Sequence, residues 1–138
     1  MFMNVVLESD AYMPERAHAT DAGADLRSRD NKIVPAHSSA TFDTGVHIAL
    51  PPNTVGFLKS KSGLNVKKNL ISTGVIDEEY TGSIVVKLYN LGNEDVQIER
   101  GDKITQLLVM PVQYVKFTQM DSLDSTDRGD NGFGSTGK

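Results

Sequence analysis

The sequence predicts an all-β fold, a sandwich or barrel with at most one short helix. Two stretches, 41–50 and 83–90, alternate apolar and polar residues with the two-residue period of a half-buried strand. The apolar faces consist of Val46, Ile48 and Leu50 in the first stretch and of Ile84, Val86 and Leu88 in the second. Turn residues such as Pro51-Pro-Asn53 and Leu91-Gly-Asn93 recur between short apolar runs. Short strands at this spacing are typical of β sandwiches and barrels.

The remaining elements follow in order along the chain. Shorter strands are expected at 5–7, 32–34, 55–59 and 96–98, and a last strand at 104–111. The apolar run within 104–111 reads as a strand buried on both faces over its second half. Only 63–69 has room for one or two helical turns, and the chain has no internal repeat.

The overall composition limits the classes of function. The chain has 138 residues, which fits one domain with a buried core. Its net charge of -4 argues against a nucleic-acid polymer as partner, because such proteins carry a basic footprint. Without cysteine, the sequence excludes disulfides and cysteine-ligated zinc and fits a reducing compartment. It has no signal peptide and no run of ~20 apolar residues, so we expect a soluble, cytoplasmic protein without a membrane partner.

The C-terminal end differs in composition from the rest. Residues 1–118 form the predicted core, and 119–138 form a connector and a glycine-rich arm; the connector is polar, acidic and without periodicity, which indicates flexibility. The arm combines Arg128, Phe133, adjacent hydroxyls and several glycines. These residues suit a nucleotide, because arginine can grip a phosphate, glycine allows close approach and an aromatic ring can stack on a base. The alternative is an ordinary frayed terminus.

Two short stretches in the predicted core suit phosphate or metal chemistry. Asp21 and Asp25 stand four residues apart around a glycine, and carboxylates suit Mg²⁺ directly or through its waters. Residues 59–65 gather two lysines, two serines and a glycine before the possible helix, which outlines an anion site. Taken alone, the first stretch is more simply an acidic turn and the second a solvated basic turn.

Two further stretches suit catalysis and ligand contact. Asp77 follows an apolar pair and precedes Tyr80 by three residues, and an acid held at the mouth of a hairpin can act as general base on a water. Gln106 lies inside an apolar run, where a buried amide needs hydrogen-bond partners. The alternatives are an ordinary acidic hairpin for Asp77 and an amide satisfied within the core for Gln106.

In their order and spacing, these five stretches resemble the five motifs of the trimeric dUTPase family, the deoxyuridine triphosphate nucleotidohydrolases. The matching segments are Ala22-Gly-Ala-Asp25-Leu26, Lys61-Ser-Gly-Leu64, Gly74-Val-Ile-Asp77-Glu-Glu-Tyr80-Thr-Gly82, Gly101-Asp-Lys-Ile-Thr-Gln-Leu107 and Arg128-Gly-Asp-Asn-Gly-Phe-Gly-Ser-Thr-Gly137. Each alone is a weak signal, but five in order make a chance likeness improbable. The resemblance runs from about Met13 to the C-terminus.

The resemblance implies a β jelly roll that assembles as a homotrimer with three shared active sites. It implies hydrolysis of dUTP to dUMP and diphosphate, which supplies the precursor of dTMP and keeps uracil out of DNA. Each site would take the first, second and fourth motifs from one copy, the third motif from its neighbour and the glycine-rich arm from the third copy.

The resemblance also implies a role for each site residue. Asp77 would deprotonate the attacking water, and Asp25 would hold the waters of a Mg²⁺ ion chelated by the triphosphate. Phosphate contacts would come from Lys61, Ser62, Gly63, Gln106, Arg128, Ser135 and Thr136. Base and sugar contacts would come from Gly74, Val75, Ile76, Tyr80 and Phe133. In this arrangement Tyr80 would pack under the deoxyribose, Phe133 would close over the uracil, and Asp102 would position a partner such as Arg128.

The chain departs from the family pattern in and around these motifs, with Ser60 where proline is common among the changes. Lys61 and Lys103 replace arginines, and lysine keeps the charge but loses the bidentate fork. Ile71 stands where many members carry an asparagine that contacts uracil. We therefore expect base recognition to rest on backbone groups of the hairpin and on Ser72 or Thr73.

Two other functions stay open on the sequence alone. The chain could be a nucleotide-gated interaction protein whose ordered arm signals to a partner. It could also have dCTP deaminase activity, which occurs in the same superfamily. The presence of every proposed chemical group, above all Asp77, favours the hydrolase.

Overall fold

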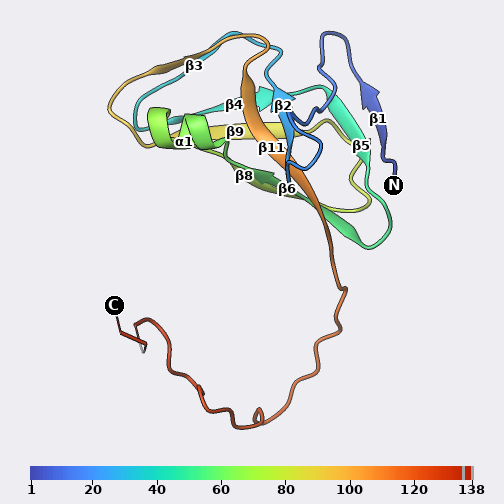
Figure 1. Ribbon diagram of the computed structural model, residues 1–138, viewed down its shortest axis with the longest axis vertical. Coiled ribbons are helices and arrows are strands. Elements are labelled where there is room, and N and C mark those ends of the chain that lie inside the picture. Colours follow the sequence, from blue (N-terminus) through green and yellow to red (C-terminus); the bar gives the residue numbers. More distant parts are fainter. Residues whose placement is uncertain (135, 138) are drawn as a thin grey trace.

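Strands account for most of the regular structure in the computed structural model, which describes residues 1–134, 136 and 137 (Figure 1). In chain order they are β1 (Asn4–Leu7), β2 (Ala24–Arg27), β3 (Lys32–Val34), β4 (Ser39–Asp43), β5 (Val46–Ala49), β6 (Thr54–Lys59), β7 (Leu70–Ile71), β8 (Thr73–Ile76), β9 (Val85–Asn90), β10 (Val96–Ile98) and β11 (Lys103–Pro111). A short helix, α1 (Ser62–Lys68), lies between β6 and β7. The prediction of an all-β fold with at most one short helix is confirmed for the described residues.

The core lies between two sheets. One has four strands in the order β2-β11-β6-β8, and the other has three in the order β4-β9-β7, with every neighbouring pair antiparallel. Two smaller pairs, β1-β5 and β10-β3, flank them. The hydrophobic core draws Leu26, Leu58 and Leu107 from the four-stranded sheet and Phe42 and Val86 from the three-stranded sheet. Burial of each such side chain contributes about 1.5–3 kcal/mol.

The predicted alternation holds, but a corner divides the first predicted strand. Val46, Ile48 and Leu50 are buried, as are Ile84, Val86 and Leu88. The stretch 41–50, expected as one strand, is split into β4 and β5 because Gly45 adopts a left-handed conformation with φ of +66°. Thr44 stays buried at this corner by donating from Oγ1 to the carbonyl of Ile84 at 2.7 Å.

The burial predicted for the last strand is wrong. In β11 the first half is the buried one, since Ile104 and Leu107 are at most 2 % exposed whereas Met110 is 45 % exposed. The strand pairs with β2 only over 103–107, while its pairing with β6 continues to Pro111. Its second half therefore lies at an edge of the sheet, which apolar composition alone does not reveal.

The connections around β6 position the candidate site. The turn expected at 63–69 is α1, which ends at Asn69 in a left-handed conformation with φ of +57°. None of its residues is buried, so it lies on the surface over β7. Strands β7 and β8 were not predicted; β8 forms an antiparallel pair with β6 and carries the chain to Asp77.

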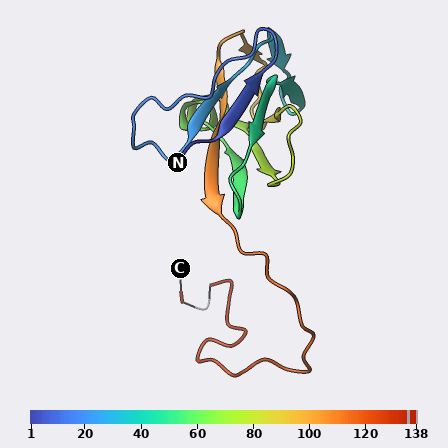
Figure 2. The ribbon, with the colours of Figure 1, turned by 90° about the vertical axis from the view of Figure 1, so that its right-hand side faces the viewer.

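The chain leaves the core at the end of β11. Figures 1 and 2 show the C-terminal part running away from the sheets. The backbone N–H of Val112 still donates to Asn53, but the described residues from 113 onward are exposed apart from Gly132. The division into a core ending at 118 and an arm thereafter stays a prediction. Within the described residues, no helix has the length and apolar character needed to cross a membrane.

Candidate functional site

Asp25 is the centre of a charged cluster at one edge of the four-stranded sheet. It lies in β2, and its side chain is only 5 % exposed. One carboxylate oxygen pairs with Lys61 Nζ, and the other lies 3.0 Å from Lys103 Nζ. Burial alone would raise the pKa of Asp25, but the two lysines outweigh it and hold that pKa below its usual value. The cluster thus unites the first, second and fourth predicted motifs.

Gln106 lies beside this cluster with a fixed orientation. Its Nε2 donates to the carbonyl of Ser60 at 3.0 Å, so the amide group has a hydrogen-bond partner within the chain. Its Oε1 lies over Gly23, where an added Cβ would overlap it. The glycine of the first motif therefore makes room for the side chain of the fourth.

The start of α1 supplies free backbone donors next to Lys61. Ser62 and Gly63 are its first residues, and the first N–H groups of a helix have no partner within it. No side chain caps this end. An added Cβ on Gly63 would meet nothing within 4 Å, so the side-chain position of Gly63 is open. This arrangement fits the predicted anion site.

A second group of predicted residues lines a separate cavity of about 240 Å³. Its walls are Leu58, Gly74, Val75, Ile76, Asp77, Tyr80, Ile84 and Val85. Asp77 is exposed at the end of β8. Tyr80 Oη donates to the carbonyl of Ser83 at 2.8 Å, and the ring covers Gly82, where an added Cβ would come within 2.6 Å of Cζ. The predicted base, sugar and catalytic residues of the third motif are thus brought together.

The two groups lie at opposite corners of the sheet. Strands β2 and β8 are its edges, three strand spacings or roughly 14 Å apart. Asp25 is level with Lys59 of β6, whereas Asp77 follows Ile76, which pairs with Gly56. This offset of about four residues adds roughly 13 Å, so the two carboxylates are on the order of 20 Å apart. One copy of the chain does not bring both groups to a single α-phosphate.

The predicted arm residues lie apart from both groups. Arg128 Nε donates to the carbonyl of Asn131 at 2.8 Å, and Phe133 and Thr136 are exposed. Ser135 lies outside the described residues. Asp102 accepts from the backbone N–H of Glu99 at 2.8 Å, which closes its own turn. Its predicted pairing with Arg128 would need the arm of another copy.

A larger hollow of about 860 Å³ lies between α1 and the loops on either side of β10. It contains Asp102 and Lys103 but none of the other predicted site residues. Its lining includes Lys67 and Lys68 as well as Glu94 and Asp95, so its charges are mixed. The smaller cavity differs in that an exposed carboxylate and a tyrosine ring converge there.

Some features of the site were missed or misread in the sequence. Lys103 was recognised only as a departure from the family pattern, because its contact with Asp25 depends on strand register. Ser72, expected as a possible uracil contact, is 3 % exposed, and its hydroxyl lies 2.8 Å from Thr105 Oγ1. That expectation is wrong for Ser72, whose polar atoms are already used inside the core, whereas Thr73 is exposed.

The described residues suit a metal ion only when a nucleotide is bound with it. Within the described part of the chain, no three histidine, aspartate or glutamate side chains come together as metal ligands would. Asp25 is a single carboxylate already shared by two ammonium groups. A divalent ion would therefore have to take most of its ligands from the phosphates of a nucleotide and from water.

A comparison with known protein families identifies the family that carries these motifs. The dUTPase family matches residues 9–137, which is nearly the whole chain. The chain belongs to the dUTPase family. Among curated relatives, the deoxyuridine 5'-triphosphate nucleotidohydrolase of Clostridium acetobutylicum is 42 % identical over 134 residues, covering 95 % of this chain and 92 % of that protein. The enzyme of the same name from Corynebacterium glutamicum is 41 % identical over 138 residues, covering 97 % and 93 %.

Solved structures of dUTPases share the fold. The G164S mutant of the Staphylococcus bacteriophage 80alpha dUTPase with dUpNHpp superposes with a TM-score of 0.89 at 30 % identity and covers 99 % of both chains. The D95N mutant of the phage phi11 dUTPase of S. aureus, described with a structural Mg(II) ion, gives a TM-score of 0.84 at 28 % identity, covering 91 % and 100 %. The predicted jelly-roll fold is confirmed by these likenesses.

Proposed function

We propose that this chain hydrolyses dUTP to dUMP and diphosphate. The observation that carries the proposal is the small cavity in which the exposed carboxylate of Asp77 and the ring of Tyr80 meet the backbone of 74–76. Relatives about 40 % identical over most of their length are named for this activity, which supports the same chemistry here.

The nucleoside would occupy the cavity of the third motif. Gly74, Val75 and Ile76 offer backbone groups to the uracil edge, and Tyr80 would pack under the deoxyribose. A tyrosine ring fixed by its hydroxyl to Ser83 leaves no room for a 2'-hydroxyl. Rejection of cytosine would rest on backbone donors and acceptors, because a base with the wrong pattern leaves them unpaired.

The phosphates would bind the cluster around Asp25. Lys61, Gln106 and the first N–H groups of α1 line one open region, and positive charge there stabilises charge that moves onto the leaving diphosphate. An arriving triphosphate competes with Asp25 for Lys61, which is 28 % exposed and able to turn outward. Asp25 would then be free to hold a metal-bound water.

Asp77 would act as the general base. Its carboxylate accepts a proton from a water, whose oxygen attacks the α-phosphorus in line with the bond to the bridging oxygen. The new P–O bond gives dUMP, and the broken bond releases diphosphate. Its exposure at the end of β8 leaves both oxygens open to a water and a substrate.

Magnesium is the metal we propose for this site, carried by the triphosphate and met by Asp25 through water. When bound it neutralises phosphate charge and fixes the phosphate conformation. The protein's own contribution is the lysine pair, Gln106 and the helix start. The structural Mg(II) named for the phage phi11 enzyme supports the affinity of such proteins for this ion.

The separation of the two groups supports a site built from several copies. dUTP carries its α-phosphate directly on the sugar, so the nucleoside cavity and the phosphate cluster must adjoin in the working enzyme. We infer a homotrimer in which Asp77 of one copy faces Lys61 of the next. The arm of the third copy would bring Arg128, Ser135 and Thr136 to the phosphates and Phe133 over the uracil.

The test is diphosphate release from dUTP, dCTP, dTTP and UTP measured in parallel with Mg²⁺. We expect turnover of dUTP alone at a high rate. Ammonia release from dCTP would instead indicate a deaminase, and tight dUTP binding without turnover would indicate an interaction protein. Neither alternative gains support from the family and relatives that the chain matches.

A further inference from the structure

The loop 80–83 that carries Tyr80 is held in place by side chains outside the five motifs. On one side, His47 Nδ1 of β5 donates to the carbonyl of Thr81 at 2.8 Å. On the other, Ser83 Oγ donates to Asp43 Oδ1 at the end of β4. Because Tyr80 Oη in turn donates to the Ser83 carbonyl, both contacts bear on the ring that lines the nucleoside cavity.

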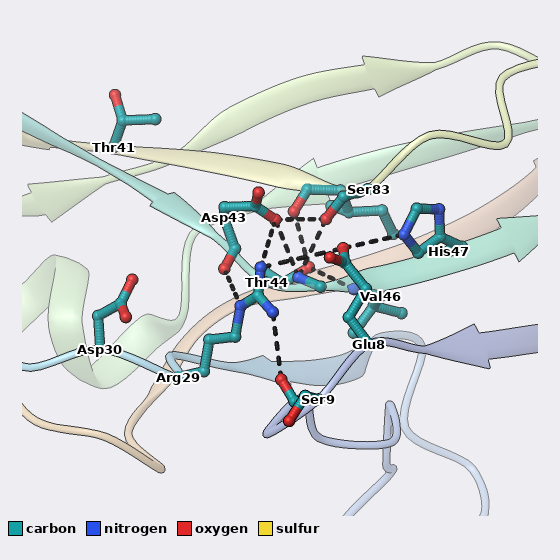
Figure 3. Close-up of polar contacts among 12 residues, drawn as sticks. Glu8, Ser9, Arg29, Asp30, Thr41, Asp43, Thr44, Val46, His47 and Ser83 are labelled. Atoms are coloured by element: carbon teal, nitrogen blue, oxygen red, sulfur yellow. Dashed lines mark hydrogen bonds and ion pairs between the residues drawn. The ribbon is translucent and has the colours of Figure 1, made fainter.

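His47 makes a second hydrogen bond that fixes its protonation state. Its Nε2 lies 3.0 Å from Glu8 Oε2, just beyond the end of β1. A backbone carbonyl and an ionised carboxylate both only accept, whereas neutral imidazole carries a single N–H. Only the imidazolium form of His47 satisfies both contacts. Figure 3 shows His47 and Glu8 facing one another beside Asp43 and Ser83.

The charges around His47 favour this form. The bond to Thr81 and then the bond to Glu8 raise the pKa of the His47 imidazole above its usual value, and the charge of Asp43 adds to them. Arg29 contacts the same two acids, since its guanidinium lies 3.9 Å from that Glu8 oxygen and 3.2 Å from Asp43. The four charged groups are His47 of β5, Glu8 just after β1, Asp43 of β4 and Arg29 in the turn after β2.

His47 and Asp43 thus clamp the loop 80–83 from its two sides. On the Asp43 side, further hydrogen bonds hold the clamp in place. Asp43 Oδ1 also accepts from the backbone N–H of Gly45 at 3.0 Å, and Arg29 Nε donates to the Asp43 carbonyl at 2.9 Å (Figure 3). An added Cβ on Gly45 would come within 2.6 Å of the Arg29 guanidinium, so the corner and the arginine are in close contact. None of these bonds depends on a group that titrates near neutral pH. The His47 side is the one that pH can release.

We propose that His47, in its imidazolium form, is a positioning residue that sets the discrimination between dUTP and UTP by holding Thr81 and hence Tyr80. The inference rests on the proposed function of this cavity. When pH rises through the raised pKa, His47 loses a proton and Nε2 turns a lone pair toward the Glu8 carboxylate. The Nδ1–H bond to Thr81 remains, but the imidazole loses its anchor on Glu8, so its hold on the loop weakens and the sugar wall loosens.

The first measurement is independent of activity. The chain has three histidines, so an NMR titration of the full-length protein resolves each imidazole. We expect His47 to titrate above the usual pKa of a histidine and Glu8→Gln to lower the titration point of His47. His37, on the exposed turn between β3 and β4, provides the control position. A titration point of His47 that is ordinary and unmoved by Glu8→Gln would overturn the assigned charge.

The second measurement is the ratio of kcat/KM for dUTP to that for UTP across the titration of His47. The ratio cancels the pH dependence of the chemistry that both substrates share. We expect a several-fold fall in the ratio as His47 deprotonates, and a low, flat ratio in Glu8→Gln and in His47→Asn. The matched control His37→Asn should keep the wild-type profile.

The outcomes distinguish a failure of the proposed dUTP hydrolysis from a failure of the positioning role of His47. A wild-type protein that does not hydrolyse dUTP refutes the proposed function, while the titration still tests the charge of His47. A wild-type ratio that stays flat while His47 titrates refutes the positioning role, as does a Glu8→Gln variant with the wild-type profile. Glu8 is 45 % exposed, so this variant tests the role even if His47→Asn does not fold.

Discussion

At the scale of single residues, the proposed general base is Asp77. We expect Asp77→Asn to fold like the parent and to lose about 10²–10⁴-fold in kcat, because an amide cannot accept the proton of the attacking water. Steady-state diphosphate release gives the rate, and circular dichroism confirms the fold. The neighbouring variant Glu79→Gln is the matched control and should stay active. Near-parental turnover by Asp77→Asn would move the base to another residue.

Tyr80 belongs to the same cavity but acts on selectivity. Removing its ring in Tyr80→Ala opens space beside the sugar, so UTP should be hydrolysed far better relative to dUTP than by the parent. Competition between the two substrates in one reaction measures this preference directly. An unchanged preference would mean that Tyr80 only packs against Gly82 and that another residue discriminates.

Asp25 makes the stability of the fold depend on pH. Its pKa is lowered in the folded protein, so its pairing stabilises above the unfolded value of 3.8 and is lost as pH falls through the lower folded value. At neutral pH we expect Asp25→Asn to reduce the free energy of unfolding by about 1–3 kcal/mol. Urea unfolding at a fixed protein concentration checks this.

The difference between Asp25→Asn and the parent should begin to narrow below pH 3.8, where the unfolded parent takes up a proton, and should close as pH falls through the lower folded pKa, where the native carboxylate does the same. Asp124→Asn, on the exposed connector, is the control and should unfold like the parent at every pH. A stability gap that stays constant down to strongly acidic pH would show that the lysine pair does not act through the charge of Asp25.

At the scale of elements, the arm after β11 is separable from the fold. Deleting 128–138 should leave the melting temperature nearly unchanged, because these residues bury little apolar surface in the described structure. Turnover of dUTP should collapse, since Arg128 and Phe133 are lost from the neighbouring site. Phe133→Ala should be milder, on the scale of the ~1–3 kcal/mol that base–aromatic stacking is worth. A deletion variant with full activity would restore the frayed-terminus interpretation.

Elements differ in how far the sequence could reveal them. The buried faces of β5 and β9 follow from alternation, because residues two apart share one side of a strand. The contact of Lys103 with Asp25 and the exposure of Met110 depend on which strands become neighbours, and no local pattern contains that information. The hydrogen bond of His47 to Thr81 joins residues 34 apart, and His47 belongs to no motif.

At the scale of the whole molecule, the proposed shared site follows from the distance between Asp77 and Asp25. The two sit at opposite corners of one sheet, so a single chain holds the two halves of its site apart. Only association of copies can bring the nucleoside cavity of one to the phosphate cluster of another. A fully active monomer in sedimentation would contradict this arrangement.

The most direct test of a site shared between copies pairs two inactive variants. Asp77→Asn and the 128–138 deletion are co-expressed with different tags, and mixed trimers are purified through both. Each mixed trimer then has one site with an intact Asp77 from one neighbour and an intact arm from the other, so we predict about one third of the parental dUTP turnover. The two variants purified separately and combined without exchange should stay inactive. Mixed trimers no more active than either variant alone would contradict the account.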